Sequence, residues 1–370
     1  MAAGQNRTER LSSVDFLRGL TVAAMILVNN PGSWNYIYAP FQHAHWDGCT
    51  PTDLIFPFFL FIAGISISIS MLKAKESGDR KGIYLKILKR TAILFALGLF
   101  LNGFPYFDFS IIRIPGVLQR IALVFCLCSF LYLSCSRKAL IIISAFLLLL
   151  YWILLCFVPM PGLAHASLEP ETNLGAWLDR LVMPGHLWQQ SKTWDPESLL
   201  GTISAIVTGL AGVLTGQWLL TVREQKDKVI GLFIAGFALI VGGLIWNPFF
   251  PINKSLWSSA FVLYTGGIAM VCLAISYYYL DVVKIKKGWT EPFLTFGSNA
   301  ITAYFVAELT ARAIGEIHVG DTDLKTWLYE HLFASWLNPY NASLSMALVW
   351  VLLLWLPLRQ MYKRNILIKI

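Results

Sequence analysis

Apolar stretches long enough to cross a lipid bilayer recur along this whole chain and constrain its fold more than any other feature. A membrane-spanning helix needs about 20 mostly apolar residues. The candidate spans lie at roughly 15–31, 52–72, 84–101, 117–134, 139–157, 198–221, 229–246, 257–280, 291–308 and 342–358. The sequence therefore predicts an all-α polytopic membrane protein with about ten transmembrane helices. Because no long polar stretch interrupts them, we expect residues 1–370 to form a single membrane-embedded domain.

The composition agrees with this interpretation. Of the 370 residues, 56% are hydrophobic and only 14% are charged, whereas a soluble domain is about 25% charged. The first apolar segment begins with Asp15 and Arg18 and lacks a small-residue cleavage site after it. A secretory signal would have that site, so we expect this segment to stay as the first helix.

The positive charges predict the orientation of the chain in the membrane. Lys and Arg outnumber Asp and Glu by 29 to 21, and most of them fall between alternate spans, at 73–90, 137–138, 223–228, 284–287 and 359–369. Cytoplasmic loops carry such an excess, so we expect both termini in the cytoplasm. The net charge of +8 then reflects topology and contact with anionic lipid, and we expect no nucleic-acid partner.

The connections expected outside the cytoplasm are longer, at 32–51, 158–197 and 309–341. In the last of these, Leu324, Leu328, Leu332 and Trp336 recur at four-residue intervals. This spacing predicts either an amphipathic helix on the outer surface or an eleventh, re-entrant element. We attribute most of the tryptophans and tyrosines to belts at the membrane interface.

The first cluster of reactive side chains joins the first two spans. His43 and His45 precede the second span, and Asp53 falls in its first turn. Asp53 has two interpretations: it complements the helix N-terminus, with Thr50 or Thr52 as the cap, or it orients His43 as a general base. His45 is expected to be a surface residue. The histidine pair resembles half of a zinc site, but no further ligands are placed to match it, so we expect no metal.

Other polar clusters stand at the ends of later spans. Because ionisable groups at membrane depth are costly, they mark candidate functional sites. Most of these clusters fall on the outer side, which predicts one convergent outer pocket. Their members are Arg113 and Arg120; His186, Asp195 and Glu197; Asn253, Lys254 and Trp257; and, within 291–308, Asn299, Tyr304 and Glu308. The alternatives are interfacial snorkelling for the arginines and hydrogen bonding between helices for Asn299 and Tyr304.

The order of several blocks resembles the heparan-α-glucosaminide N-acetyltransferase family, in its bacterial transmembrane acyltransferase branch. The blocks are SVDFLRGLTVAAMILVNN, HAHWDGCTPTDLIFPFFLFIAG, RIPGVLQRI, WDPESLLGTISAIVTGLAG, NKSLWSSAFVL and FGSNAITAYFVAE, and they cover essentially the whole chain. The resemblance implies an enzyme of the bacterial inner membrane. Its acetyl donor would be cytosolic acetyl-CoA, used as a co-substrate, and its acceptor an amino sugar of the glucosamine type on the extracytoplasmic face.

The resemblance also assigns roles to residues. The family's histidine stands in an H-A-x-W block, which matches His43, and its helix-2 aspartate matches Asp53. The asparagine that ends the first helix matches Asn29, and the arginine pair matches Arg113 and Arg120. His43 is then the base, Asp53 orients it, and Asn29 or an arginine stabilises the oxyanion. Direct transfer and an acetyl-histidine intermediate both remain open.

The remaining expectations concern the two substrates. On the outer side we expect the acceptor to contact Arg113, Arg120, His186, Asp195, Glu197, Lys254, Trp257 and Asn299. On the inner side Arg18, Lys86, Lys89 and Arg90 either bind the phosphates of CoA or anchor to lipid headgroups. The rival function is an amino-sugar transporter, which needs similar polar groups near the midplane. A homo-oligomer is one alternative for the assembly.

The charge distribution yields a testable topology. Tags placed after Ser77, Asp227 and Gly288 are expected to report the cytoplasm, and tags near Ala164 and Gly320 the opposite side. The measurement is accessibility of each tag to a membrane-impermeant reagent in intact cells. A tag at Ala164 that reports the cytoplasm would reverse the orientation and remove the basis for an outer pocket.

Overall fold

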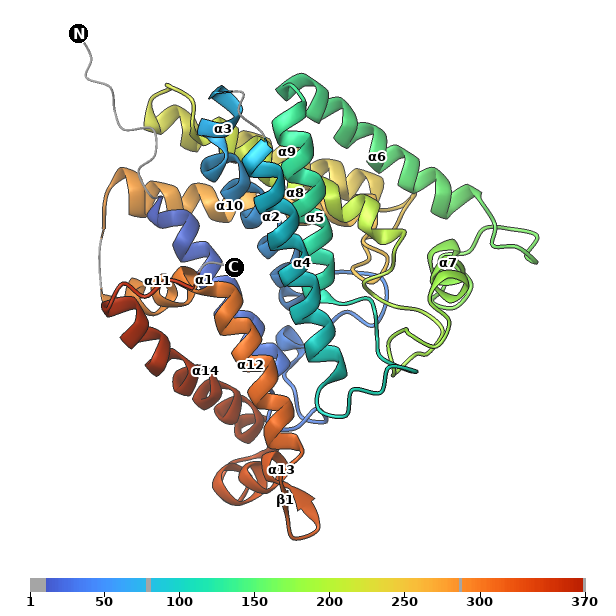
Figure 1. Ribbon diagram of the computed structural model, residues 1–370, viewed down its shortest axis with the longest axis vertical. Coiled ribbons are helices and arrows are strands. Elements are labelled where there is room, and N and C mark those ends of the chain that lie inside the picture. The colour runs from blue at the N-terminus through green and yellow to red at the C-terminus, as the bar shows by residue number, and fades with distance from the viewer. Residues whose placement is uncertain (1–10, 78–80, 286–287, 369–370) are drawn as a thin grey trace.

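The computed structural model describes residues 11–77, 81–285 and 288–368 and confirms the all-α class (Figure 1). The helices are α1 (Ser12–Asn29), α2 (Ile55–Ser70), α3 (Leu72–Ser77), α4 (Lys81–Gly103), α5 (Val117–Ser134), α6 (Arg137–Phe157), α7 (Leu174–Val182), α8 (Gly201–Leu219), α9 (Gln225–Trp246), α10 (Ser259–Tyr277), α11 (Glu291–Ser298), α12 (Ala300–Gly315), α13 (Leu324–Leu328) and α14 (Pro339–Lys363). Within the described residues the only strands, β1 (His318–Val319) and β2 (Thr322–Asp323), pair as an antiparallel hairpin.

Short helical turns accompany the long helices. They are η1 (Ala39–Phe41), η2 (Pro51–Leu54), η3 (Tyr278–Val282), η4 (Gly288–Thr290) and η5 (Tyr329–Ala334). In the described part of the chain, 8 helices are long and apolar enough to cross a membrane: α1, α2 with η2, α5, α6, α8, α9, α10 with η3, and α14. They correspond to eight of the expected spans. The expected span 84–101 lies in α4, a helix of 23 residues.

The expected span 291–308 is not one continuous helix. It breaks at Asn299, whose backbone (φ −131°, ψ 46°) separates α11 from α12. The Asn299 side chain donates to the Ile366 carbonyl at 3.0 Å and accepts from the Ile368 N–H at 2.9 Å. A short amide side chain that binds backbone elsewhere competes with helix formation, which accounts for the break.

The segment 309–341, all of it described, contains no helix long enough to cross a membrane; the predictions of a surface helix or a re-entrant element stay untested. The segment α13 with η5 has 5 plus 6 residues, about 17 Å of helix, against the ~30 Å of a bilayer core. Within this segment Leu328 and Phe333 pack inward, while Leu332 and Trp336 are 52% and 71% exposed.

The helices divide into a buried centre and a periphery. In α2, α8 and α10 about two thirds or more of the apolar window is buried (72%, 67% and 67%), whereas the values for α6, α9 and α14 are 22%, 22% and 28%. In Figure 1, α6 and α14 lie at opposite edges, while α3 and α13 lie at opposite ends of the molecule. The peripheral apolar faces suit contact with lipid.

Glycines allow the central helices to approach closely. A Cβ added at Gly64 of α2 would lie 2.0 Å from the Gly209 carbonyl oxygen, and one at Gly212 of α8 would lie 1.9 Å from the Phe61 carbonyl oxygen. Small residues at such crossings let backbones pack together in membranes. The contact fixes α2, which directly follows Asp53 and the rest of η2, against α8, which follows the 183–200 loop.

This crossing can be tested with a matched pair of variants. Gly212→Ala is expected to destabilise the protein by about 1–3 kcal/mol or more, because the methyl group meets backbone rather than a flexible side chain. Gly266→Ala, in α10, introduces a methyl group with nothing within 4 Å and is expected to be neutral. Thermal unfolding in detergent measures both. Equal midpoints for the two variants would contradict the assignment.

Candidate active site

The helix ends predicted to face away from the cytoplasm are called outer below, and the opposite ends inner. At their outer ends, five helices surround a cavity of about 520 Å³. Side chains from α1, α2, α4, α5 and α12 line it, together with the loops before α2, α8 and α10. Its principal polar and aromatic residues are Asn29, Trp34, His43, His45, Trp46, Asp53, Asn102, Arg113, Trp188, Trp194, Glu197, Lys254, Tyr304, Glu308 and Arg312. Each predicted polar cluster therefore contributes at least one residue to this cavity.

His43 and Asp53 form a close pair on the wall of this cavity. His43 Nδ1 lies 2.6 Å from Asp53 Oδ1, and Asp53 is only 1% exposed. The second oxygen of Asp53 accepts the backbone N–H groups of Thr50 and Ala44 at 2.9 and 3.0 Å and the Thr50 hydroxyl at 3.0 Å. This geometry fits both interpretations of Asp53: one oxygen caps the helical turn, and the other contacts the imidazole. The role of His43 as a general base stays a prediction.

Lys254 is the third member of this cluster. The loop before α2 docks on the loop before α10 because Asn253 donates to Asp47 at 3.1 Å and Gly48 donates to the Ile252 carbonyl at 2.7 Å. This docking places Lys254 Nζ 3.1 Å from Nδ1 and 3.3 Å from Nε2 of His43. Burial lowers the pKa of Lys254, although the nearby carboxylates Asp53 and Glu197 act in the opposite direction.

The geometry defines what this cluster can do chemically. When Nδ1 of His43 donates to Asp53, Nε2 presents a lone pair that can accept a proton or attack a carbonyl. The ammonium of Lys254 stabilises a negatively charged oxygen that forms beside it. The neighbouring Cys49 is a poor nucleophile at neutral pH, because burial and the charge of Asp53 raise its pKa to about 12.

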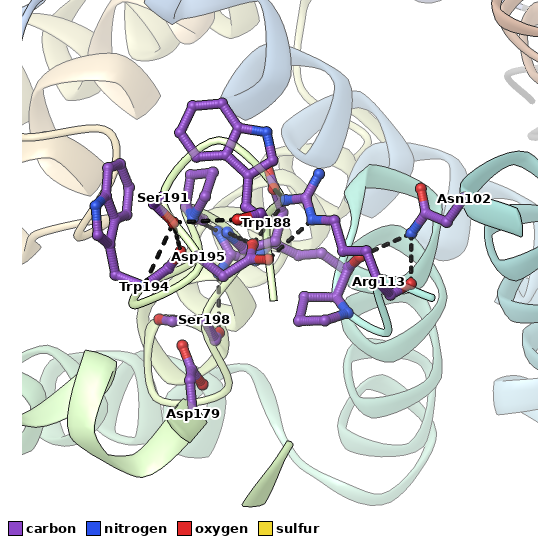
Figure 2. A network of polar contacts seen from close by, with 12 residues as sticks. Asn102, Arg113, Asp179, Trp188, Ser191, Trp194, Asp195 and Ser198 are labelled. Carbon is purple, nitrogen blue, oxygen red and sulfur yellow. Dashed lines mark hydrogen bonds and ion pairs between the residues drawn. The ribbon is translucent and has the colours of Figure 1, made fainter. Parts of the chain in front are cut away.

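Arg113 anchors the loop before α8 (Figure 2). Its Nε and Nη2 donate to the two oxygens of Asp195 at 2.8 and 2.6 Å, and Nη2 also donates to Glu197. Burial disfavours these charges, but Arg113 holds the pKa of Glu197 below its usual range. The carboxylates in turn raise the pKa of Arg113. Arg113 and Glu197 line the cavity, whereas Asp195 lies behind them.

Three other residues expected to bind the acceptor do not line the outer cavity. Arg120 is 2% exposed and donates to the carbonyls of Pro196 and Ser198 at 3.1 and 3.0 Å. Its guanidinium lies 5.1 Å from the ring of Trp257, which is 1% exposed. His186 Nδ1 binds a backbone carbonyl at 2.8 Å. These three side chains therefore lie behind the residues that line the cavity, and Arg120 and His186 bind backbone carbonyls there.

A second cavity, of about 340 Å³, lies toward the inner ends of the helices. Asn299, expected in the acceptor site, lines this cavity instead. Arg18 donates to Asp15 and Ser66 at 2.8 Å and to the Gly297 carbonyl at 3.1 Å. The other lining residues are Phe59, Ala63, Ile67, Ser70, Arg90, Leu94, Ile121, Phe125, Ser298, Ala300, Ile301 and Ile368.

The four basic residues predicted for the inner side separate into two pairs. Arg18 and Arg90 face the inner cavity, and the guanidinium of Arg90 stacks 4.6 Å above the Phe125 ring. Lys86 and Lys89 lie on the same helix as Arg90 but are exposed, and neither lines the cavity. The geometry thus favours the arginines as ligands for an anion and leaves the lysines available to lipid headgroups.

The same helices line both cavities. On α2, Phe56 lines the outer cavity and Phe59 the inner one; on α12, Tyr304 lines the outer cavity and Ile301 the inner one. Residues three apart on a helix are separated by about 4.5 Å along its axis. The wall between the two cavities is therefore about one helical turn thick.

Sequence reasoning missed one contact and the contribution of three tryptophans to the outer cavity. Asn29 donates to Glu308 Oε1 at 2.9 Å, although the two residues come from α1 and α12. Trp46, Trp188 and Trp194 line the cavity instead of serving only in an interfacial belt. The position of the last two in a long outer loop beside Asp195 and Glu197 was the available signal.

The fold and the two cavities define a polytopic α-helical membrane protein with a histidine–aspartate–lysine cluster in an outer cavity and two arginines in an inner one. Residues 10–175 match the family model described as heparan-alpha-glucosaminide N-acetyltransferase, catalytic. The chain is 31% identical over 358 residues to the heparan-alpha-glucosaminide N-acetyltransferase of Mus musculus, covering 81% of this chain and 53% of the relative.

The enzyme of the same name from Homo sapiens is 32% identical over 353 residues, covering 80% of this chain and 52% of the relative. The chain therefore belongs to the heparan-α-glucosaminide N-acetyltransferase family, as the sequence blocks indicated. It spans about half the length of these curated relatives.

Proposed function

We propose that this protein is a transmembrane N-acetyltransferase that moves an acetyl group from cytosolic acetyl-CoA to an amino sugar of the glucosamine type on the extracytoplasmic face. The observation that carries the proposal is the pair of cavities on the same helices, one with Arg18 and Arg90 and the other with His43. The names of the relatives supply the reaction class. The proposed location is the bacterial inner membrane, with both termini in the cytoplasm.

The dimensions of the cavities suit a donor that enters from the cytoplasm. On α2 the inner cavity begins at Ser70 and the outer one reaches Phe56, a distance of about 21 Å along the helix. An extended pantetheine arm is about 20 Å long, roughly six residue lengths. With the CoA phosphates at Arg18 and Arg90, the thioester reaches the floor of the outer cavity.

The N-terminus of α12 adds to this anion site. Ser298, Asn299 and Ala300 line the inner cavity, so the first backbone N–H groups of a 16-residue helix lie beside it. Helix N-termini favour phosphate because their N–H groups have no partner within the helix and carry a partial positive charge. Two guanidiniums and a helix N-terminus are all groups that attract the phosphates of CoA.

In the outer cavity the amine nitrogen of the sugar bonds to the thioester carbonyl carbon, and the bond from that carbon to sulfur breaks. His43 Nε2 takes the proton from the amine, and CoA leaves as the thiol after protonation. Lys254 stabilises the oxyanion because its Nζ lies beside His43, at 3.1 Å from Nδ1, although it also pairs with Asp53 at 3.7 Å. Attack by His43 itself gives an acetyl-histidine intermediate with the same groups.

A second candidate function is transport of an amino sugar. The break at Asn299 beside the inner cavity and the thin wall between the cavities favour it, because transporters bind substrate at interrupted helices near the midplane. The decisive experiment incubates purified protein with acetyl-CoA and a panel of amino sugars and measures release of free CoA. Accumulation of sugar in proteoliposomes without acetyl-CoA, and no CoA release, would favour the transporter.

The two histidines of the outer cavity are expected to differ in importance. His43→Ala is expected to lower kcat for CoA release by about 10²–10⁴-fold, the usual loss when a general base is removed. His45→Ala is the control, since His45 lines the same cavity but does not contact Asp53, and a change within a few-fold is expected. Equal losses in both variants would indicate a shared structural or metal-binding role.

The inner cavity offers a second matched pair. Arg90→Gln is expected to raise KM for acetyl-CoA about tenfold or more, the cost of a charge-assisted hydrogen bond, and to leave KM for the sugar unchanged. Lys89→Gln removes an exposed charge one residue away and is expected to have little effect. Steady-state kinetics at low salt measures both, because salt screens such contacts. A rise in the sugar KM instead would exclude Arg90 from the donor site.

A further inference from the structure

Three indole rings form a continuous wall on one side of the outer cavity. The Trp46 and Trp194 rings pack edge-to-face with centroids 5.3 Å apart, and those of Trp188 and Trp194 do so at 5.5 Å. All three line the cavity and are half-buried. Trp46 follows His43 by three residues, so this tryptophan wall adjoins the proposed reaction centre.

The loop that carries two of these rings is held unusually firmly (Figure 2). Arg113 binds Asp195 through two hydrogen bonds, and the Leu199 N–H donates to Asp179 at 2.9 Å. Between the rings, Lys192 adopts φ 62° and donates its N–H to the Trp188 carbonyl at 2.8 Å. A non-glycine residue keeps that conformation only where its surroundings enforce it, as they do at ligand-binding sites.

Polar groups beside the rings are left without partners. Within the described part of the chain, the indole N–H groups of Trp188 and Trp194 donate no hydrogen bond. They are not fully buried, whereas the indole N–H groups of Trp350 and Trp355, which also have no partner, are fully buried. Glu197 uses Oε2 for Arg113, and its Oε1 accepts no hydrogen bond from any described residue. The wall thus combines apolar ring faces with donors and an acceptor that are open to the cavity.

This combination fits an uncharged ring that carries hydroxyl groups. A sugar presents C–H groups on one face, which pack on an aromatic surface, and hydroxyls at its rim, which pair with N–H and carboxylate groups. The cavity, at about 520 Å³, falls within the ~300–1,000 Å³ range of sites for drug-sized ligands, which are larger than one sugar. A reacting amino sugar at His43 leaves room for a second ring.

We propose that Trp46, Trp188 and Trp194 form a carbohydrate subsite for the sugar next to the one that is acetylated. The inference rests on the proposed function and specifies its acceptor as a glycan of at least two sugars, or a glycoside, with the amino sugar at its end. The tryptophan wall binds the penultimate ring by stacking, and Glu197 Oε1 accepts from one of its hydroxyls.

The test compares glucosamine with its β-linked disaccharide as acceptors for the purified protein. Wild type is expected to show a KM about five- to tenfold lower for the disaccharide, the range expected for one additional aromatic contact. Trp188→Ala is expected to raise KM for the disaccharide about five- to tenfold and so to remove that preference. Trp188→Phe keeps a flat aromatic ring and is expected to retain part of the preference for the disaccharide.

The control variant is Trp336→Ala, which removes a tryptophan that is 71% exposed and lies outside the cavity. It is expected to leave both KM values unchanged. Equal KM values for the two acceptors in wild type, or an equal rise for both in Trp188→Ala, would overturn the subsite.

Binding of the N-acetylated disaccharide, measured by calorimetry, separates this proposal from the proposed reaction because it requires no turnover. Trp188→Ala is expected to weaken it about five- to tenfold. If this loss is seen while neither acceptor is acetylated, the subsite stands and the acetyltransferase assignment fails. If acetylation occurs but the variant binds the product as tightly as wild type, the subsite is wrong and the reaction stands.

Discussion

A backbone polar group without a partner is costly inside a bilayer, and this cost decides where the protein can interrupt its helices. The break between α11 and α12 falls at Asn299, and the backbone on either side of it lines the inner cavity. At the other end of the bundle, α1 ends at Asn29 and α5 begins after Gly116, and both residues line the outer cavity. Helix ends and cavities coincide because the released polar groups need water, a side chain or a ligand. The positions of the two cavities therefore follow from the solvent in which the chain folds.

Buried charged groups need hydrogen-bonding partners for the same reason. Asp53 is almost wholly buried, and its two oxygens contact a helical turn, a loop backbone and an imidazole, so one carboxylate both caps η2 before α2 and binds His43. Arg113 likewise ties together two carboxylates of the loop before α8. Since a buried charge is tolerated only with several partners, each such group fixes the segments that supply them. The rigidity of the outer cavity is a consequence of burying these charges, and it is the condition for placing reacting groups within hydrogen-bonding distance.

Much of the outer site could be predicted because the polar clusters adjoin helix ends that the hydropathy pattern already places on one side. His43, Asp53, Arg113, Glu197 and Lys254 do converge. The depth and direction of each side chain could not be predicted. Arg120 and Trp257 come from the same clusters yet point into the protein interior, and Asn299 belongs to the inner cavity because its helix breaks. Trp188 and Trp194 were attributed to the membrane interface, since the same residue type serves both an interface and a binding site.

The sequence by itself determined the helical membrane class, the family, eight of the spans and the set of polar residues available to a site. Each of these depends on local properties: the length of an apolar run, the charge of a loop, the order of short blocks. Only the tertiary structure decided that there are two cavities separated by about one helical turn, and that Asn29 meets Glu308 across 279 residues of sequence. It also decided that Arg90 faces a cavity while Lys86 and Lys89 do not. These features depend on how each helix is rotated and where it crosses its neighbours, as at Gly19 and Gly297, where a Cβ would meet the opposing backbone within 2 Å. Rotation and crossing are set by packing between distant segments, which no local pattern encodes.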